Sequence, residues 1–246
     1  MTKPLRLPDA SALIEVCEAT WPPASRKALG AWTIREGKGG GNRVSAATEA
    51  WPVTEADLPV AERAMRALGQ EPLFQIREGN DKLDTLLEAH GYIVRDPVNL
   101  WAVATAGLAE APIPRATIYT MWPPLELVRD IWTDGGVGEA RQAVMDRVTG
   151  EKTAILARSG DYPAGAAFAA IHDGVAMVHA LYVKPSMRRQ GAGGMMIRAA
   201  AKWAQAQGVD LLGLVVTQGN HAANPLYADL GITRVGHYHY RVRPIG

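Results

Sequence analysis

Three apolar runs joined by very short polar turns restrict the fold of this chain more than any other feature. The runs cover residues 153–158, 164–172 and 175–183, and the turns between them contain Gly160-Asp161 and Asp173-Gly174. Apolar runs of this length are typical of buried β-strands, and strands joined by such tight turns are antiparallel neighbours. The sequence therefore predicts an antiparallel sheet in the second half of the chain.

Helices are predicted both before and after these strands in the sequence. Helical spacing of apolar residues is found at 125–134, 139–148 and 194–207. A further strand at 210–217, a short helix at 220–230 and an alternating strand at 232–242 follow. The expected fold class is α/β, with a mixed, mostly antiparallel sheet flanked by helices.

A domain boundary is expected where the periodic pattern is interrupted at residues 106–114. Gly107, Pro112 and Pro114 stand there after a hydrophobic run. A division at this point gives two domains in tandem, residues 1–112 and 113–246.

The first half contains a faint copy of the end of the second half, at a shift of 140 positions. Asn80 matches Asn220, and Gly91 matches Gly231. The order of strand, Asn-led helix, glycine and strand is kept in both places, which predicts an internal duplication. Two unrelated α/β segments are the alternative.

Composition argues against several classes of protein. Lys and Arg number 26 against 25 Asp and Glu, a net charge of +1, so there is no basic field of the kind that nucleic-acid binding needs. No apolar window approaches the ~18–20 residues of a membrane span, and the amino terminus lacks the apolar core of a secretory signal. The single cysteine, Cys17, excludes an internal disulfide framework. We expect a cytoplasmic protein with neither nucleic-acid nor membrane partners.

The segment most informative about chemistry lies between the strand that ends at Val183 and the helix that begins near Gly194. It contains two arginines and three glycines, so several backbone N–H groups can face one anion at the helix N-terminus. The Walker A pattern is absent, and Met196 stands where a dinucleotide fingerprint needs its third glycine. The loop therefore fits neither an NTPase nor a Rossmann dehydrogenase.

This loop resembles motif A of the GCN5-related N-acetyltransferase (GNAT) superfamily. Arg188, Gly191 and Gly193 meet its R/Q-x-x-G-x-G/A pattern directly after the Val183-x-Pro185 strand end. A second block of the family, N-x-x-A-x-x-L-Y-x-x-L-G, is met by the run from Asn220 to Gly231. The resemblance covers the second half of the chain.

The resemblance implies acetyl-CoA as co-substrate and no metal. It places the pantetheine arm along the strand and the diphosphate in the loop, a cofactor site made of Leu181, Tyr182, Val183, Arg188, Arg189, Gln190, Gly191, Ala192, Gly193 and Gly194. Asn220 and Asn224 would add a contact to the cofactor arm, although one of them is also expected to cap the short helix.

Two residues are candidates for catalysis. Tyr227 resembles the family tyrosine that donates a proton to the departing CoA thiolate, with a buried structural tyrosine as the alternative. His179 lies on a strand that resembles the one carrying the catalytic histidines of arylalkylamine N-acetyltransferases, and its imidazole would suit a general base. Only one of those two histidines is matched, because Met177 stands at the other position. A water relay or a histidine with a structural role remain alternatives.

The expected function is transfer of the acetyl group of acetyl-CoA to a primary amine, in a small molecule or peptide, by direct attack. A non-catalytic acyl-CoA-binding or sensing module is the alternative.

The first half resembles a degenerate GNAT-like domain, because residues 50–54 stand where a cofactor loop would be. Residues 38–42 read as a flexible hairpin tip. Sequence leaves the oligomeric state open between monomer and homodimer.

Overall fold

The computed structural model describes residues 5–114 and 117–244 of the chain. In its first half the elements are α1 (Ala10–Thr20), β1 (Ser25–Leu29), β2 (Trp32–Glu36), α2 (Asn42–Ser45), β3 (Thr48–Glu49), a 3-10 turn η1 (Glu55–Asp57), α3 (Leu58–Ala67), β4 (Leu73–Arg77), α4 (Asp81–Ala89), β5 (Ile93–Ala104) and α5 (Thr105–Glu110). Asp9 caps α1, because its carboxylate accepts the Ala12 N–H at 3.0 Å.

The second half contains β6 (Ile118–Met121), α6 (Glu126–Asp134), α7 (Glu139–Asp146), β7 (Lys152–Ser159), β8 (Tyr162–His172), β9 (Val175–Val183), a 3-10 turn η2 (Pro185–Met187), α8 (Ala192–Ala206), β10 (Leu211–Thr217), α9 (Ala223–Asp229) and β11 (Thr233–Val242). The three strands expected from the tight turns are β7, β8 and β9, and they are antiparallel neighbours.

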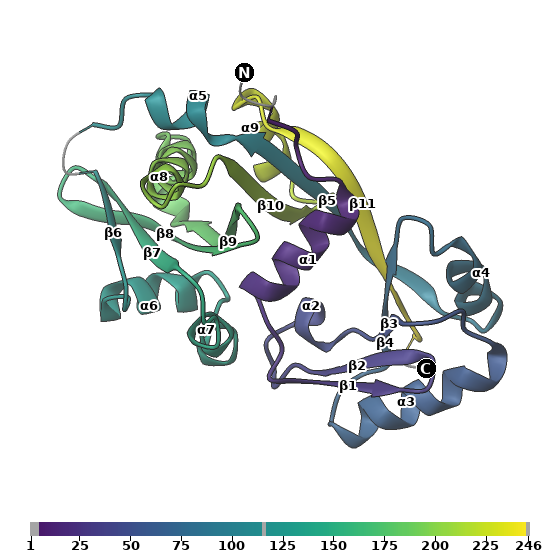
Figure 1. Cartoon of the computed structure of the whole chain (residues 1–246). Coiled ribbons are helices and arrows are strands. Elements are labelled where there is room, and N and C mark those ends of the chain that lie inside the picture. The colour runs from purple at the N-terminus through teal and green to yellow at the C-terminus, as the bar shows by residue number, and fades with distance from the viewer. Residues whose placement is uncertain (1–4, 115–116, 245–246) are drawn as a thin grey trace.

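Strands from both halves build the main sheet, whose order is β4-β11-β5-β10-β9-β8-β7-β6 (Figure 1). The pair β9 and β10 is parallel, and the other pairs in this sheet are antiparallel. Strands β1, β2 and β3 form a second sheet. The expectation of a mixed, mostly antiparallel sheet flanked by helices is confirmed.

The last strand of each half pairs with a strand of the other half. Strand β11 pairs with β4, where Tyr238 stands opposite Arg77, and β5 pairs with β10, where Val98 stands opposite Thr217. These two pairs are related by the shift of 140 positions found in the sequence. The order strand, helix, strand is thus repeated as β4-α4-β5 and β10-α9-β11, with the last strands exchanged between the halves.

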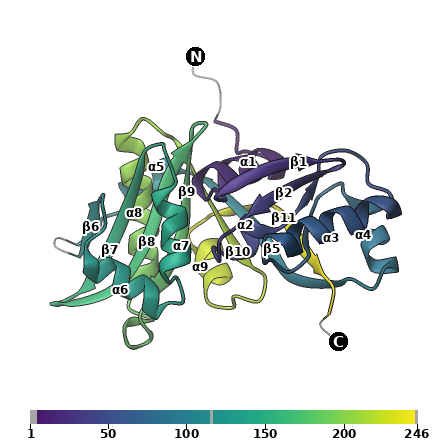
Figure 2. The ribbon, with the colours of Figure 1, turned by 90° about the horizontal axis from the view of Figure 1, so that it is seen from below.

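Helices cover both faces of the main sheet (Figure 2). On one face α8 packs with α5 over an apolar cluster that includes Met196, Leu212 and Leu214. On the other face α1 covers Leu100 and Met177, while α6 and α7 cover β7 and β8. The small side chains along β8 allow this close packing from both sides, because most of them are alanines buried completely.

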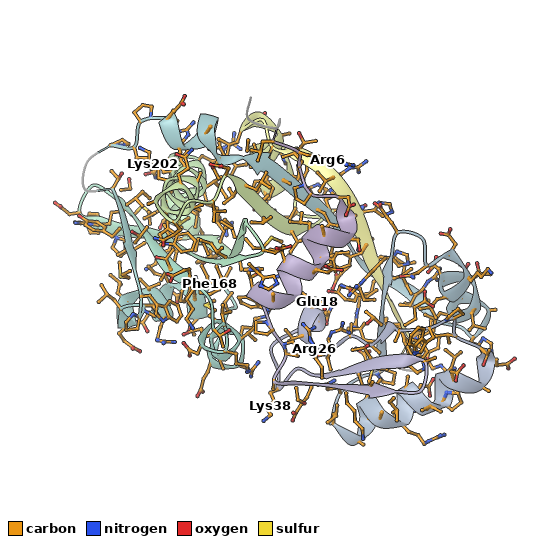
Figure 3. The ribbon with its side chains drawn as sticks, viewed as in Figure 1. Arg6, Glu18, Arg26, Lys38, Phe168 and Lys202 are labelled. Carbon is orange, nitrogen blue, oxygen red and sulfur yellow. The ribbon has the colours of Figure 1, made fainter. Side chains whose placement is uncertain are left out.

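One carboxylate ties α1 to the strands of the first half. Glu18 projects from α1 toward them (Figure 3), and three arginines surround it. Arg26 lies at 3.3 Å and Arg35 at 2.8 Å, and Arg77 also donates to the same carboxylate. Two of these cations come from β1 and β2 and one from β4, so this ion-pair group holds α1 between the two sheets.

The first part of the segment in which a domain boundary is expected, residues 106–114, is helical. Residues Thr105–Glu110 form α5, and Leu108 and Ala109 are buried against the cluster under α8. Burial of these side chains outweighs the helix-weakening effect of Gly107, which costs only about 1 kcal/mol relative to alanine. A cut at residue 112 would also separate β5 from both of its partners in the sheet.

Candidate active site

The site begins where β9 and β10 move apart. The two strands pair from Leu211 opposite Val175 to Leu214 opposite Val178, although β9 continues to Val183 and β10 to Thr217. Beyond that point each strand keeps its other neighbour, β8 or β5. The sheet therefore opens between its two parallel strands, and the ends of both strands line the opening.

A bulge in β9 causes this divergence. Ala180 has a φ of +48°, and the register against β8 shifts between Ala166 and Phe168. The indole N–H of Trp132, from α6, donates to the Ala180 carbonyl at 3.1 Å. The side chain of Trp132 is fully buried, so α6 fixes the conformation of the bulge from behind.

The opening widens into a cavity of about 900 Å³, lined by both halves of the chain. Leu181, Tyr182 and Val183 of β9 form one side of it. Leu181 and Val183 pack toward the α8 face, whereas the Tyr182 ring lies against Gly135 on the opposite face. Of these three residues, Tyr182 therefore lines the cavity with its backbone, because its ring lies on the other face of the sheet.

The arginine and glycine loop lies at one end of the cavity. Arg188 and Arg189 are exposed, and neither is ion-paired within the part of the chain that the structure describes. The Arg188 Nε donates to the Val183 carbonyl at 3.2 Å, and Ser159 donates to the Gln190 side chain at 2.9 Å. These bonds hold the loop between the end of β9 and the start of α8.

Gly191 is the residue before α8 and has a φ of +84°, in the left-handed region that favours glycine. A Cβ built on it would meet no atom within 4 Å, so the space above the loop is open. No side chain caps the first turn of this helix. Its first N–H groups therefore have no side-chain partner, and Ala192, Gly193 and Gly194 line the cavity wall, where such groups can face an anion.

Tyr227 lines the same cavity from α9. Its ring is 5% exposed and contacts the ring of Trp101 edge-on, with 6.1 Å between centroids. Burial raises the pKa of its hydroxyl to about 12, so the phenol is protonated at neutral pH. Among the described residues no hydrogen-bond partner of this hydroxyl is found, which leaves it free to donate to a bound molecule.

His179 also reaches the cavity, but its imidazole is enclosed. The side chain of Thr20 lies 2.8 Å from Nε2, and Nη1 of Arg43 lies 3.1 Å from Nδ1. A guanidinium can only donate, so Nδ1 must be the acceptor and Nε2 must carry the proton given to Thr20. The Thr20 hydroxyl then donates to the Val16 carbonyl at 2.7 Å. Burial, together with the charge of Arg43, holds the pKa of His179 well below its usual value of 6.5.

The two asparagines are used by the protein itself. The Asn220 side chain accepts the backbone N–H groups of Ala222 and Ala223, at 3.3 and 3.0 Å, in the turn that leads into α9, whose N-cap residue is Ala222. The Asn224 amide donates to the carbonyl oxygens of Thr217 and Asn220 at 3.0 and 2.9 Å. Its own oxygen accepts from Asn99 on β5. Asn224 therefore fixes the end of β10, which forms the second edge of the opening.

Several residues in the cavity wall were not expected from the sequence. They come from the first half or from outside the two motif blocks, and they are Trp21, Asn42, Arg43, Asp96, Arg141, Tyr238 and Tyr240. Residues 38–42, expected as a hairpin tip, instead lead into α2 and bring Arg43 to the cavity. A lone arginine in a glycine-rich loop carries no local signal of such a position, because the contact depends on how the halves pack.

The described part of the chain contains no group of three or more His, Cys, Asp or Glu side chains placed to hold a metal ion. His237 instead pairs with Glu78, and His239 with Asp84, each at 2.9 Å. No helix in residues 5–114 or 117–244 is both long and apolar enough to cross a membrane.

Residues 118–232 match the model of the acetyltransferase (GNAT) family, so this segment is a GNAT domain. Over nearly its whole length the chain is also similar to YobR, described as an uncharacterised N-acetyltransferase of Bacillus subtilis. The two are 22% identical, and the similarity covers 96% of this chain and 99% of that protein.

Solved structures show the same fold across both halves. A GCN5-related N-acetyltransferase from Kribbella flavida superimposes with a TM-score of 0.70 at 22% identity, covering 96% of each chain. A tandem GNAT protein from the clavulanic acid biosynthesis pathway superimposes with a TM-score of 0.63 at 12% identity, covering 100% of this chain and 92% of that one. At these identities the likeness establishes the architecture.

Proposed function

We propose that this chain is an acetyl-CoA-dependent N-acetyltransferase that acts on a primary amine, with residues 113–246 as its catalytic part. The main support is one juxtaposition: Tyr227, the open end of β9 and the loop before α8 line a single cavity. The reaction needs a strand edge for the thioester arm, an anion site for the diphosphate and a proton donor near the sulfur. All three lie within the GNAT domain.

The loop fits the diphosphate of acetyl-CoA in charge and shape. Arg188 and Arg189 supply positive charge, and Gly191 leaves open space through which phosphate oxygens can approach the backbone. The positive end of α8, 15 residues long, adds to the attraction. We assign the diphosphate to residues 188–194 and the pantetheine arm to the backbone of Leu181–Val183.

In the proposed reaction the amine nitrogen attacks the carbonyl carbon of the thioester. A C–N bond forms, the C–S bond breaks, and the sulfur takes a proton while the nitrogen loses one. Tyr227 is the proton donor, because its hydroxyl is free and protonated. Alignment of amine and thioester in the cavity supplies much of the rate. Cys17 lies on the buried face of α1 and burial raises the pKa of its thiol, so no covalent enzyme intermediate is invoked.

The surroundings of His179 favour a positioning role over that of a base. Its Nδ1 already accepts from Arg43, and a second proton would place two cations side by side in a buried site. We infer that water in the cavity carries the proton away from the amine, and that His179 fixes the guanidinium of Arg43.

The first half is proposed to hold no cofactor. Residues 50–54 stand where the loop would be, and they lead into η1, where the Asp57 carboxylate accepts from the Thr54 N–H and hydroxyl at 2.9 and 2.7 Å. A carboxylate at this position would repel a diphosphate. The first half instead contributes β5 and part of the cavity wall, as expected of a degenerate GNAT-like domain.

A charge-reversal experiment tests the cofactor site. We expect Gly191→Glu to abolish calorimetrically detectable acetyl-CoA binding, because it adds a negative side chain and a strained φ beside the diphosphate. Gly174→Glu is the matched control, since Gly174 also has a positive φ and open space but lies in the β8–β9 turn. A folded Gly191→Glu protein that binds as tightly as the wild type would place the site elsewhere.

Acetyl transfer itself is tested by thiol release from acetyl-CoA in the presence of amines, aminoglycosides, amino acids and peptides. An acceptor-dependent release with an N-acetylated product supports the enzyme. A non-catalytic acyl-CoA sensor would bind acetyl-CoA but release no thiol with any acceptor class. The free hydroxyl of Tyr227 favours the enzyme, because a sensor needs no proton donor at this position.

A further inference from the structure

Arg43 is placed in the cavity by α2, opposite the strand that ends in the proposed thioester site. Its guanidinium carbon lies 5.9 Å from the centroid of the Trp21 ring, and Nη1 lies 3.1 Å from His179. His179 stands two residues before Leu181 on β9. Arg43 is thus held in the cavity wall by Trp21 and His179, and by side-chain hydrogen bonds with Tyr238 and Cys17.

No counter-charge accompanies this guanidinium. The titratable groups that interact electrostatically with it are the hydroxyls of Tyr238 and Tyr240 and the thiol of Cys17. Burial raises the pKa of all three groups, so they are neutral. Within the described residues no carboxylate lies within ion-pair distance of Arg43, and its buried Nε has no hydrogen-bond partner. Within the described residues the guanidinium therefore has neutral hydrogen-bond partners and an unpartnered Nε–H, but no anionic partner.

Among the described residues, the two most deeply buried arginines are each paired with a carboxylate. Arg35 lies 2.8 Å from Glu18, and Arg241 lies 2.6 Å from Asp84. A buried charge without a partner costs several kcal/mol, and a planar guanidinium matches carboxylate and phosphate groups. The difference between Arg43 and these two arginines is that Arg43 faces a cavity, so a bound molecule can supply the missing anion.

The wall near Arg43 also contains a carboxylate. Asp96 has a φ of +45° and accepts from the Asn42 side chain at 3.0 Å, and within the described ranges it forms no ion pair. Arg141, from α7, lines the same cavity. This part of the wall therefore presents both signs of charge, which suits a molecule that carries an amine and an anion.

We propose that Arg43 binds an anionic group, carboxylate or phosphate, of the acceptor amine, so that the acceptor is an amino-acid-like or aminoalkyl-phosphate molecule. This assignment rests on the proposed acetyl transfer and names the substrate class of the same cavity. Arg43 acts as a specificity determinant, because it favours an amine with a neighbouring anion over the same amine without one.

The test uses matched pairs of amines and of their acetylated products. Each amine is offered in an anionic and a neutral form: phenylalanine and phenylalaninamide for a carboxylate, phosphoethanolamine and ethanolamine for a phosphate. Wild type is compared with Arg43→Gln, Arg43→Lys and Arg63→Gln, the last a matched control because Arg63 is exposed on α3. The readouts are kcat/KM for each amine, acetyl-CoA affinity by calorimetry, and binding of each N-acetylated product to the protein with CoA.

We expect wild type and Arg63→Gln to prefer the anionic member of at least one pair, in kcat/KM and in product binding. Arg43→Gln should lose roughly 10²-fold for that member alone, as for removal of one partner of a buried charge pair. Arg43→Lys should restore part of the preference, and acetyl-CoA affinity should stay unchanged. The pair that shows the preference tells whether Arg43 binds a carboxylate or a phosphate.

The assignment is overturned if the wild type shows no difference between the anionic and the neutral member of any pair, in kcat/KM or in product binding. Failure to acetylate or bind either member counts as no difference. A preference that survives in folded Arg43→Gln and Arg43→Lys proteins overturns it as well. If acetyl-CoA binds but no amine is acetylated, the proposed acetyl transfer fails, and binding of the N-acetylated pairs still decides the role of Arg43. If neutral amines are acetylated as well as anionic ones, acetyl transfer stands and the assignment to Arg43 fails.

Discussion

At the residue scale, Tyr227 combines burial with a free hydroxyl. Phenylalanine would keep its contact with Trp101 and remove only the proton donor. We expect Tyr227→Phe to lower kcat by 10²–10⁴-fold, the usual contribution of a positioned acid, with little change in acetyl-CoA affinity. Steady-state kinetics with an acceptor found in the thiol-release screen measure this effect. A near-normal kcat would transfer the role of acid to water or another residue.

His179 is expected to be neutral throughout the pH range in which the enzyme is assayed. Burial and the charge of Arg43 hold its pKa well below 6.5 in the folded protein, so the imidazole is neutral at pH 6.5 and above. His179→Asn keeps an oxygen that can accept from Arg43 but removes the titrating group. The acidic limb of the pH profile of kcat/KM should therefore keep its midpoint in this variant. Disappearance of that limb, with a large loss of rate, would identify His179 as the base.

The loop of arginines and glycines between β9 and α8 could be located from the sequence because its signal is local, whereas its binding of an anion stays a prediction. Arginines and glycines between a strand end and a helix start produce the same backbone geometry wherever the fold allows it. Arg43 could not be predicted, because its role depends on His179 and Trp21, which are distant from it in the sequence. His179 was identified as a site residue, but its hydrogen bonds to Thr20 and Arg43 change the role that it can play.

At the element scale, the bulge in β9 depends on a helix behind it. We expect Trp132→Phe to cost about 1–3 kcal/mol of stability, from a lost hydrogen bond and a small buried cavity. Acetyl-CoA affinity should fall as well, because the Ala180 carbonyl would no longer be held. Thermal unfolding and calorimetry measure the two effects.

Trp122→Phe is the control for this substitution. Trp122 contacts Phe168 and Lys152 but does not line the cavity. Its replacement should leave acetyl-CoA affinity unchanged, whatever it costs in stability. If both variants lose affinity to the same degree, the effect is one of general packing and not of the bulge.

Strands β7, β8 and β9 could be predicted from their turns, and α8 from its helical spacing, because these signals act over a few residues. The place of β5 between β10 and β11 could not, since strand pairing over such a distance leaves no local pattern. Helix α5 was missed for a related reason. Its glycine argued for a break, whereas its stability comes from packing against α8.

At the scale of the whole molecule, the two halves repeat one order of elements but differ in their anion sites. We expect a saturating titration to give one acetyl-CoA per chain, because residues 50–54 lack the glycine loop of the second half and the Asp57 carboxylate bonds to Thr54 at the end of this segment. Isothermal titration calorimetry measures this number, and Gly191→Glu should reduce it to zero. Two equivalent sites would contradict the proposal that the first half lacks a cofactor.

The exchange of last strands between the halves also affects how the protein is assembled. Two separate copies of such a half could pair in this manner only as a dimer, whose stability would depend on concentration. Because both copies lie in one chain, the partner strand is always present at a high effective concentration. The β10 edge of the cavity, braced by β5, is thereby kept in place even when the protein is very dilute.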